Sequence, residues 1–538
     1  MKRKNMIIAL ITMALLFCGA FLLYAGKDGR QKQSAGEKNA SVALRQESRS
    51  GAVTTKYATK VAKKELKLSQ AKALSKLEQY KGQYDKTSIV LENTSKKRAK
   101  QIAADLGAKL RITKDGKYAQ LTLPKGTSIS DVYADKKNLS YISDMSPDWI
   151  AEPAEVTQDE GTQEGALPDD SLQDSQDDSD DAGLGEKSSD LTRESVSKFN
   201  DPLYSRQTYY HYMNMGNVLS QKSDRKIKVA IIDSGIDIDH PEFKGIISER
   251  SYNASTDQVA EDYGMDVVQD CMGHGTVCAG MIAAANNNNE GIVGVNNNVE
   301  LVVIKCETNP DKTFKRSSDI NFGLAYAIEQ NVDVVSMSIG GGGPSNPYAK
   351  YCQLAVDSDI TVVASAGNDT TATPSWPAAD PNVIGVGALE ENAWTISWYS
   401  NFGDNSDIMA PGRVLTTQDG GGYTMVHGTS LATPLVAGVV ARFYATHSNV
   451  TYSMVKELLE ASAKDLGDQG EDWIYGFGAM DVDTFINGDI GKVTFDYMTD
   501  DIKNTTQLYY RNHILQNFPE PERDGVVFAG WYLDEQCT

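Results

Sequence analysis

The sequence predicts an α/β protein: a three-layer sandwich with a mostly parallel central sheet, preceded by a small α+β domain and followed by a small β-rich unit. The first observation is that short apolar strands alternate with helical patterns from Lys226 onward, which is typical of a parallel sheet covered by helices. The second is a β-α-β-β-α order of patterns within residues 86–153. The expected strands of the large sheet are Lys228–Ile232, Leu301–Lys305, Val332–Met337, Thr361–Ala364 and Val383–Val386.

The small domain is expected at residues 86–153 because the spacing of apolar residues there alternates between strand-like and helix-like within short segments. Gly107 ends a helical pattern, and Asp115-Gly116 is a hairpin turn signal between two alternating segments. The expected elements are a strand at Ser88–Leu91, a helix at Lys96–Leu106, strands at Arg111–Thr113 and Tyr118–Leu123, and helical or irregular structure at Ser130–Asp144.

Charge is divided unevenly along the 538 residues, whose net charge is −21. Residues 27–150 hold 26 Lys+Arg against 13 Asp+Glu, a balance of +13, whereas residues 191–538 hold 22 against 46, a balance of −24. The acidic C-terminal part is unsuited to nucleic acid, because phosphates require a basic surface. The basic N-terminal part is instead suited to docking on the acidic remainder.

The N-terminus carries the pattern of an export signal. Met1-Lys2-Arg3-Lys4 precedes an apolar run over residues 6–25, so that residues 1–26 form either a cleaved signal peptide or an uncleaved membrane anchor. Residues 27–85 are expected to be a tether followed by a helix. The expected location is outside a bacterial cell, either secreted or on the outer face of its membrane.

Residues 154–198 are expected to be a disordered acidic linker. Within them, residues 155–190 hold 13 Asp+Glu and one Lys, with few apolar residues to bury. The cysteines of the chain show no disulfide pattern, since the five outside the apolar run are an odd number. We expect buried free thiols.

Four segments carry polar residues where a catalytic site of such a sheet would lie, at the carboxyl ends of strands. Asp233 ends an apolar strand, and His274 stands between two glycines at the start of a small-residue helix. Ser430 follows Gly-Thr at the start of another helix, and Asn368 follows a strand in Ala-Gly-Asn. Each residue alone has an ordinary structural explanation. A zinc site around His274 is disfavoured because its Cys-x2-His-x3-Cys spacing does not match the usual ligand pairs.

Together these segments resemble the subtilisin-like serine proteases. The Asp-Ser-Gly, Gly-His-Gly-Thr, Ala-Gly-Asn and Gly-Thr-Ser-x-Ala motifs occur in that family's order, and the resemblance covers residues 199–487. It departs from the family pattern at His427 and Leu435, neither of which is catalytic. The resemblance implies an Asp233, His274 and Ser430 triad with Asn368 in the oxyanion hole.

The same resemblance implies a serine endopeptidase that hydrolyses protein or peptide substrates through an acyl-enzyme, without a cofactor for its chemistry. We expect it to be a monomer. Residues 86–153 resemble the family's inhibitory prodomain, which implies a zymogen in which the prodomain is an intramolecular inhibitor. Self-cleavage is then expected between about Ala151 and Asn200.

Two further features lead to more specific expectations. Glu242 and Asn287 stand where the family often binds structural calcium, while a solvated, turn-forming loop is an equal alternative at Asn286–Asn289. Residues 488–538 resemble the Listeria–Bacteroides repeat of bacterial surface proteins. The alternative is a β-rich tail packed on the protease.

Overall fold

The computed structural model describes residues 69–92, 94–153, 157–158, 199–222, 225–306, 315–341, 346–390, 394–497, 505–511 and 531. The chain divides into two units, Met1–Ala71 and Lys72–Thr538, and nearly all of the described residues belong to the second. The expected export signal, most of the tether and nearly all of the acidic linker lie outside them. Within the described ranges, none of the helices combines the length and apolar character needed to cross a bilayer.

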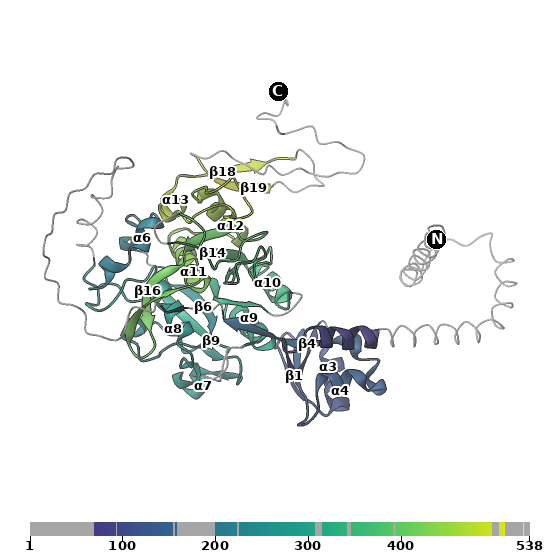
Figure 1. The fold of residues 1–538 in the computed structure, drawn as a ribbon. Helices are drawn as coiled ribbons and strands as arrows, with labels where there is room; N and C mark the ends of the chain where they lie inside the picture. The colour runs from purple at the N-terminus through teal and green to yellow at the C-terminus, as the bar shows by residue number, and fades with distance from the viewer. Residues whose placement is uncertain are drawn as a thin grey trace, which may run out of the picture. The chain divides into compact units, whose positions relative to one another are not determined.

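An eight-stranded sheet forms the centre of the large domain and confirms the predicted fold class (Figure 1). Its order is β15-β14-β13-β11-β6-β9-β7-β8, and every neighbouring pair is parallel except β7 with β8. The strands are β6 (Ile227–Asp233), β7 (Tyr252–Asn253), β8 (Gln258–Val259), β9 (Val299–Lys305), β11 (Val334–Met337), β13 (Thr361–Ser365), β14 (Ile384–Leu389) and β15 (Ile408–Pro411).

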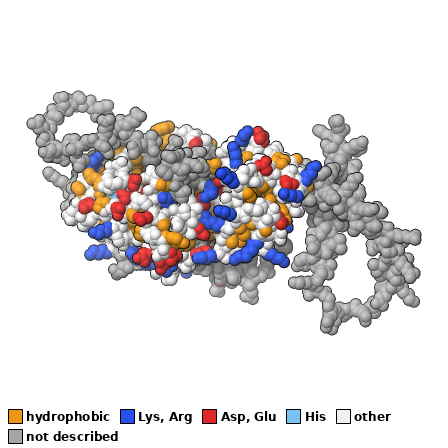
Figure 2. Space-filling model, turned by 90° about the horizontal axis from the view of Figure 1, so that it is seen from below, with side chains coloured by type: hydrophobic (Ala, Val, Ile, Leu, Met, Phe, Trp, Pro, Cys, Tyr) orange, Lys and Arg blue, Asp and Glu red, His pale blue; other side chains and the backbone are white. Residues whose placement is uncertain are grey.

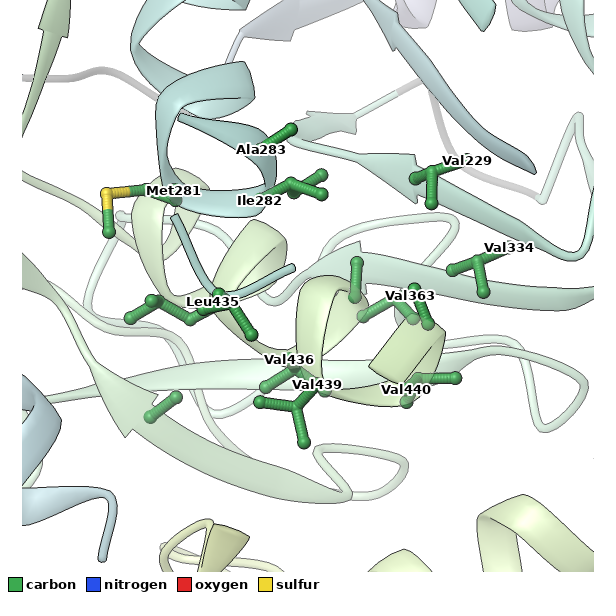
Figure 3. Packing of buried hydrophobic residues seen from close by; sticks show 14 of the residues in the cluster. Val229, Met281, Ile282, Ala283, Val334, Val363, Leu435, Val436, Val439 and Val440 are labelled. Carbon is green, nitrogen blue, oxygen red and sulfur yellow. The ribbon is translucent and has the colours of Figure 1, made fainter. Parts of the chain in front are cut away.

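Helices cover both faces of this sheet, because successive side chains of each strand point to opposite faces. Val229 and Ile231 of β6 belong to the core under helices α8 and α11, whereas Ala230 and Ile232 belong to the core under α9 and α10. Figure 3 shows the first core, in which valines of three strands meet α8 and α11. The helices are α8 (His274–Ala283), α9 (Ser317–Glu329), α10 (Ala349–Val356), α11 (Thr429–Thr446), α12 (Tyr452–Ser462) and α13 (Val482–Asn487).

Shorter elements complete the large domain. A hairpin of β16 and β17 lies beside α8 and leads into α11. These elements are α6 (Tyr209–Tyr212), α7 (Ala260–Tyr263), β16 (Arg413–Gln418) and β17 (Gly422–His427), with 3-10 turns at Tyr204–Arg206, Val218–Ser220, Pro241–Phe243 and Met265–Val268.

The N-terminal α+β domain is an antiparallel sheet in the order β4-β1-β3-β2, packed on two helices. Gly107 ends its first helix in the left-handed conformation, with φ of 63°. Residues 69–79 form a further helix. The elements are β1 (Tyr84–Glu92), α3 (Lys96–Leu106), β2 (Lys109–Ile112), β3 (Tyr118–Thr122), α4 (Ile129–Ala134) and β4 (Met145–Pro153), with 3-10 turns at Lys136–Asn138 and Ile142–Asp144.

Strand β4 continues out of the small domain and joins the large one. Its last residues pair antiparallel with β10 (Lys315–Arg316) on one side and with β12 (Ile339–Gly341) on the other. Beyond it, the short strand β5 (Thr157–Gln158) pairs antiparallel with β17. Thr157 and Gln158, which were expected to be disordered, are therefore part of a sheet of the large domain.

The C-terminal unit begins with a hairpin of β18 (Ile490–Phe495) and β19 (Thr505–Tyr510). Tyr510 is 2% exposed, and its hydroxyl donates a 2.9 Å hydrogen bond to the carbonyl oxygen of Phe485 in α13. Trp531 contacts the rings of Phe495 and Tyr497. The described part of this unit packs on α12 and α13 of the large domain, and the resemblance of residues 488–538 to the surface-protein repeat stays a prediction.

The surface of the described residues mixes charges of both signs. Figure 2 shows one face, on which basic and acidic side chains lie among apolar ones. The described cysteines form no disulfide, as expected: Cys278, Cys306 and Cys352 are buried thiols, and Cys271 is partly exposed. The large apolar side chains exposed in the described residues are Tyr263, Trp398, Trp473 and Ile474.

Candidate active site

The three predicted triad residues lie at the carboxyl edge of the sheet, each at the end of an element. Asp233 is the last residue of β6, His274 is the first of α8, and Ser430 is the second of α11. All three are buried, with exposed fractions of 1%, 8% and 0%. Strand ends and helix starts of an α/β sheet converge at this edge, which is why residues 41 and 156 positions apart in the sequence meet there.

Asp233 holds the imidazole of His274 in place. Its Oδ1 lies 2.8 Å from Nδ1 of His274, and the same oxygen accepts a 2.6 Å hydrogen bond from the backbone N–H of Ser234. Burial, the largest single cause, lowers the pKa of His274, but electrostatic attraction and hydrogen bonding from Asp233 and Cys278 together raise it by more, so that the net shift is upward. Nε2 of His274 is buried and has no hydrogen-bond partner among the described residues, and it is the atom a general base would use.

Ser430 begins α11, where the helix dipole favours negative charge. Its Oγ lies 3.5 Å from the carbonyl oxygen of Ser338, and its own carbonyl oxygen accepts a 2.8 Å hydrogen bond from the Ser338 hydroxyl. The Cys278 thiol lies between the two catalytic segments, 3.9 Å from Nδ1 of His274 and 3.5 Å from the Ser430 carbonyl oxygen. All three triad residues are thus part of one buried cluster.

Asn368, the predicted oxyanion donor, lies beside the start of α11. Its Oδ1 accepts hydrogen bonds from the backbone N–H and the hydroxyl of Thr429, at 3.0 and 2.8 Å. These two bonds fix which end of the amide is the acceptor. The NH₂ end is therefore the end that can donate to an oxyanion formed at Ser430.

The expected calcium ligands form a different structure. Glu242 is 1% exposed, and each of its two carboxylate oxygens already accepts two hydrogen bonds. Asn287 accepts from the backbone of Asn200 through its side chain. Calcium needs six to eight oxygen lone pairs directed at the ion, so this arrangement does not fit one. The donors to Glu242 are Ala285 N at 3.0 Å, Asn288 Nδ2 at 3.0 Å, Ile292 N at 3.0 Å and the Tyr423 hydroxyl at 2.8 Å.

Sequence reasoning missed residues that support the triad. Ser338 holds the Ser430 backbone, and Thr429 orients Asn368. Thr429 belongs to the Gly-Thr-Ser-x-Ala motif, so the sequence indicated its position but not its role. Ser338 directly precedes strand β12, and only its place in the fold brings it to Ser430.

Comparison with known proteins agrees with this geometry. The family model "Subtilase family" matches residues 224–478. The chain is 37% identical over 261 residues to a subtilisin of Bacillus pumilus, an alignment that covers 48% of this chain and 89% of that protein. The chain belongs to the subtilase family. This subtilase is also 37% identical to subtilisin E of Bacillus subtilis, of whose length it spans 64%.

A solved structure supports the fold of this subtilase. Fervidolysin from Fervidobacterium pennivorans, a keratinolytic enzyme related to subtilisin, aligns with a TM-score of 0.61 and 21% identity. The alignment covers 77% of this chain and 64% of fervidolysin. At that identity the likeness supports the fold alone.

Proposed function

We propose that this subtilase is a serine endopeptidase that acts on protein or peptide substrates. The observation that carries the proposal is the 2.8 Å contact between Asp233 and His274 beside the helix start that bears Ser430. A serine hydroxyl is a weak nucleophile at its ordinary pKa and needs a neighbouring base to act. The chemistry uses only side chains and backbone groups of the chain itself.

The mechanism follows from these positions. Nε2 of His274 accepts the Ser430 proton as the oxygen attacks the scissile carbonyl, and Asp233 stabilises the imidazolium that forms. The Ser430 N–H and the Asn368 amide donate to the tetrahedral oxyanion. His274 then returns the proton to the leaving amine, and water hydrolyses the acyl-enzyme by the same route.

We further propose that the enzyme is made as a zymogen and cleaves itself. β4 ends at Pro153 between β10 and β12, and β5 begins at Thr157 on β17, the strand that leads toward Ser430. β12 directly follows Ser338, whose hydroxyl contacts the Ser430 backbone. Pro153 thus pairs with the residue after Ser338, and Thr157 pairs with His427, three residues before Ser430. This pairing supports cleavage of a peptide bond between Pro153 and Thr157.

Contacts of the small domain support its role as an intramolecular inhibitor. Asp148 is fully buried and accepts hydrogen bonds from Ser317 and from both the backbone and the hydroxyl of Ser318, so it caps the start of α9. At the other end of that helix, Nζ of Lys114 lies 2.6 Å from Oε2 of Glu329. The Lys114–Glu329 pair follows the basic-to-acidic complementarity of the sequence, whereas the Asp148 contacts are hydrogen bonds to neutral donors.

The proposed location is outside a bacterial cell, on the strength of the N-terminal charge and apolar pattern. Whether residues 6–25 are cleaved or retained as an anchor is decided by the mass of the mature product.

The test compares wild type with Ser430→Ala, using intact mass, N-terminal sequencing and hydrolysis of a protein substrate. We expect the wild type to lose its N-terminal domain and become active, and Ser430→Ala to stay uncut and inactive. Ser462→Ala is the matched control, because Ser462 is a buried serine of α12 whose hydroxyl donates to the carbonyl oxygen of Leu459. An uncut but active wild type would refute self-activation, whereas an active Ser430→Ala enzyme would refute the assigned nucleophile.

A further inference from the structure

One buried carboxylate, Asp270, organises the start of the helix that bears His274. The first N–H groups of a helix need partners, and the residue before α8 is Gly273, which has no side chain to supply one. Asp270 takes that role: its Oδ1 accepts from the backbone of Met272 and Gly273, at 3.0 and 2.9 Å. Its Oδ2 accepts from the backbone and the hydroxyl of Thr276, at 2.8 and 2.6 Å.

Asp270 also reaches the segment that bears Asp233. The hydroxyl of Ser234, the next residue after Asp233, donates a 2.8 Å hydrogen bond to Oδ1 of Asp270. The same hydroxyl oxygen accepts a 2.9 Å hydrogen bond from the backbone N–H of Gly275. One carboxylate and one hydroxyl therefore connect the residues that flank both members of the Asp233–His274 pair.

The two segments touch through their backbones, so this connection sets a close approach. A Cβ added to Gly275 would lie 2.0 Å from the carbonyl oxygen of Gly235. Gly235 has φ of 119°, and a Cβ there would lie 2.6 Å from the carbonyl oxygen of Val268. With no side chain between the backbones, a change in the polar contacts at Asp270 moves one segment directly against the other.

We propose that Asp270 is a positioning residue that sets the distance between Asp233 and His274. The proposal rests on the proposed peptidase function and adds Asp270 to Asp233, His274, Ser430 and Asn368 as a fifth residue at this edge of the sheet, one that touches neither substrate nor reacting atoms. Misplacing a catalytic group by about 1 Å costs on the order of 10²-fold in rate. Asp270→Asn keeps the shape but turns an amide N–H toward the Thr276 or Gly273 donors, which pushes the start of α8 away.

The decisive measurement is kcat per active site in the full chain. Active sites of wild type and Asp270→Asn are counted by stoichiometric labelling with a serine-directed fluorophosphonate, which removes differences in folded yield. We expect kcat to fall by about 10²-fold with KM nearly unchanged. We also expect the acid limb of the kcat profile to move to lower pH, because His274 loses part of its contact with Asp233.

Two further variants keep the test decisive. Asp380→Asn is the control, because Asp380 is also buried and also accepts from a backbone N–H, that of Asn382, but contacts neither triad segment. Ser234→Ala leaves the four hydrogen bonds between Asp270 and the start of α8 intact and removes the Ser234 hydroxyl, which bonds to Asp270 and to the Gly275 N–H. It therefore decides the question if Asp270→Asn does not fold. We expect it to lower kcat in the same direction and Asp380→Asn to leave kcat and its acid limb unchanged.

The outcomes separate this proposal from the proposed function. If the wild type cleaves no substrate, the peptidase function fails and the role of Asp270 fails with it. If the wild type is active and both Asp270→Asn and Ser234→Ala match its kcat and acid limb per labelled site, the positioning role alone is overturned. If little mature enzyme accumulates, the rate at which each precursor cleaves itself replaces kcat in the comparison of wild type with the variants.

Discussion

The thiol of Cys278 lies directly behind the imidazole of His274, with Sγ 3.9 Å from Nδ1 and 3.5 Å from the carbonyl oxygen of Ser430. Cys278 follows His274 by one helical turn of α8, which places both side chains on the same face of the helix. The thiol is 1% exposed. A bulky group bonded to this sulfur would occupy space that the triad needs.

The first prediction concerns this thiol. A small organic mercurial should inhibit the mature wild type and leave Cys278→Val active, because the bound mercury displaces His274 and about 1 Å of displacement costs on the order of 10²-fold in rate. Cys352→Val is the control, since Cys352 is equally buried but lies on α10. Equal inhibition of Cys278→Val and wild type would assign the effect to another thiol.

The second prediction concerns the partner of the imidazole. Asp233→Asn should lower kcat by about 10⁴-fold with little change in KM, because the amide favours the wrong tautomer of His274 and no longer stabilises its charged form. Asp233 and Cys278 both raise the pKa of His274, so once the Asp233 charge is removed the residual activity should persist to lower pH than in wild type. A pH–rate profile of both enzymes checks this, and an unshifted acid limb would contradict it.

The third prediction concerns the oxyanion hole. Asn368→Ala should lower kcat by about 10²–10³-fold and leave KM nearly unchanged, because the donor acts on charge that develops only in the transition state. Asn382→Ala is a control at a site that contacts Asp380 instead of α11. A large rise in KM with constant kcat would show that Asn368 binds substrate and not the oxyanion.

The fourth prediction concerns the loop that Glu242 holds. Because both carboxylate oxygens face N–H and O–H donors, a chelator should leave the thermal midpoint of the mature enzyme unchanged. Glu242→Gln should destabilise it by about 1–3 kcal/mol, since the new amide N–H would face those donors without a partner. Unfolding curves with and without calcium check both statements, and a midpoint that falls on chelation would restore the calcium site.

The fifth prediction concerns pH and the prodomain. Burial raises the pKa of Asp319 to about 6, although the positive charges of Arg316 and Arg111 act to lower it. Arg111 belongs to the small domain, and its Nη1 lies 3.4 Å from Oδ1 of Asp319. A carboxyl whose pKa is raised in the docked state favours docking when protonated, so docking should tighten as the pH falls through about 6 and weaken above it.

Its measurement is co-elution of the cleaved prodomain with the protease domain at pH 5 and pH 8. We expect more complete co-elution at pH 5, and a smaller difference between the two pH values in Asp319→Asn. Arg250→Gln serves as the control, because Arg250 pairs with Glu261 on the protease surface. Equal pH dependence in Asp319→Asn and wild type would assign it to another group.

The sequence by itself determined the fold class and indicated the three residues of the proposed triad. Asp233, His274 and Ser430 stand at strand ends or helix starts in short motifs, so that local patterns and their order predict both the elements and their meeting at one edge of the sheet. Gly107 shows the same for the small domain, since a glycine after a helical pattern predicts the left-handed end that it forms.

Only the tertiary structure decided how these residues are held. The family resemblance marked Glu242 as a possible calcium ligand, but whether its lone pairs are available depends on donors as distant in the sequence as Tyr423. The role of Asp270 depends in the same way on Ser234, and that of Ser338 on the backbone of Ser430. The physical reason is that a hydrogen bond requires donor and acceptor within about 3 Å, and such distances between remote segments are set by the packing of strands and helices, which no local pattern records.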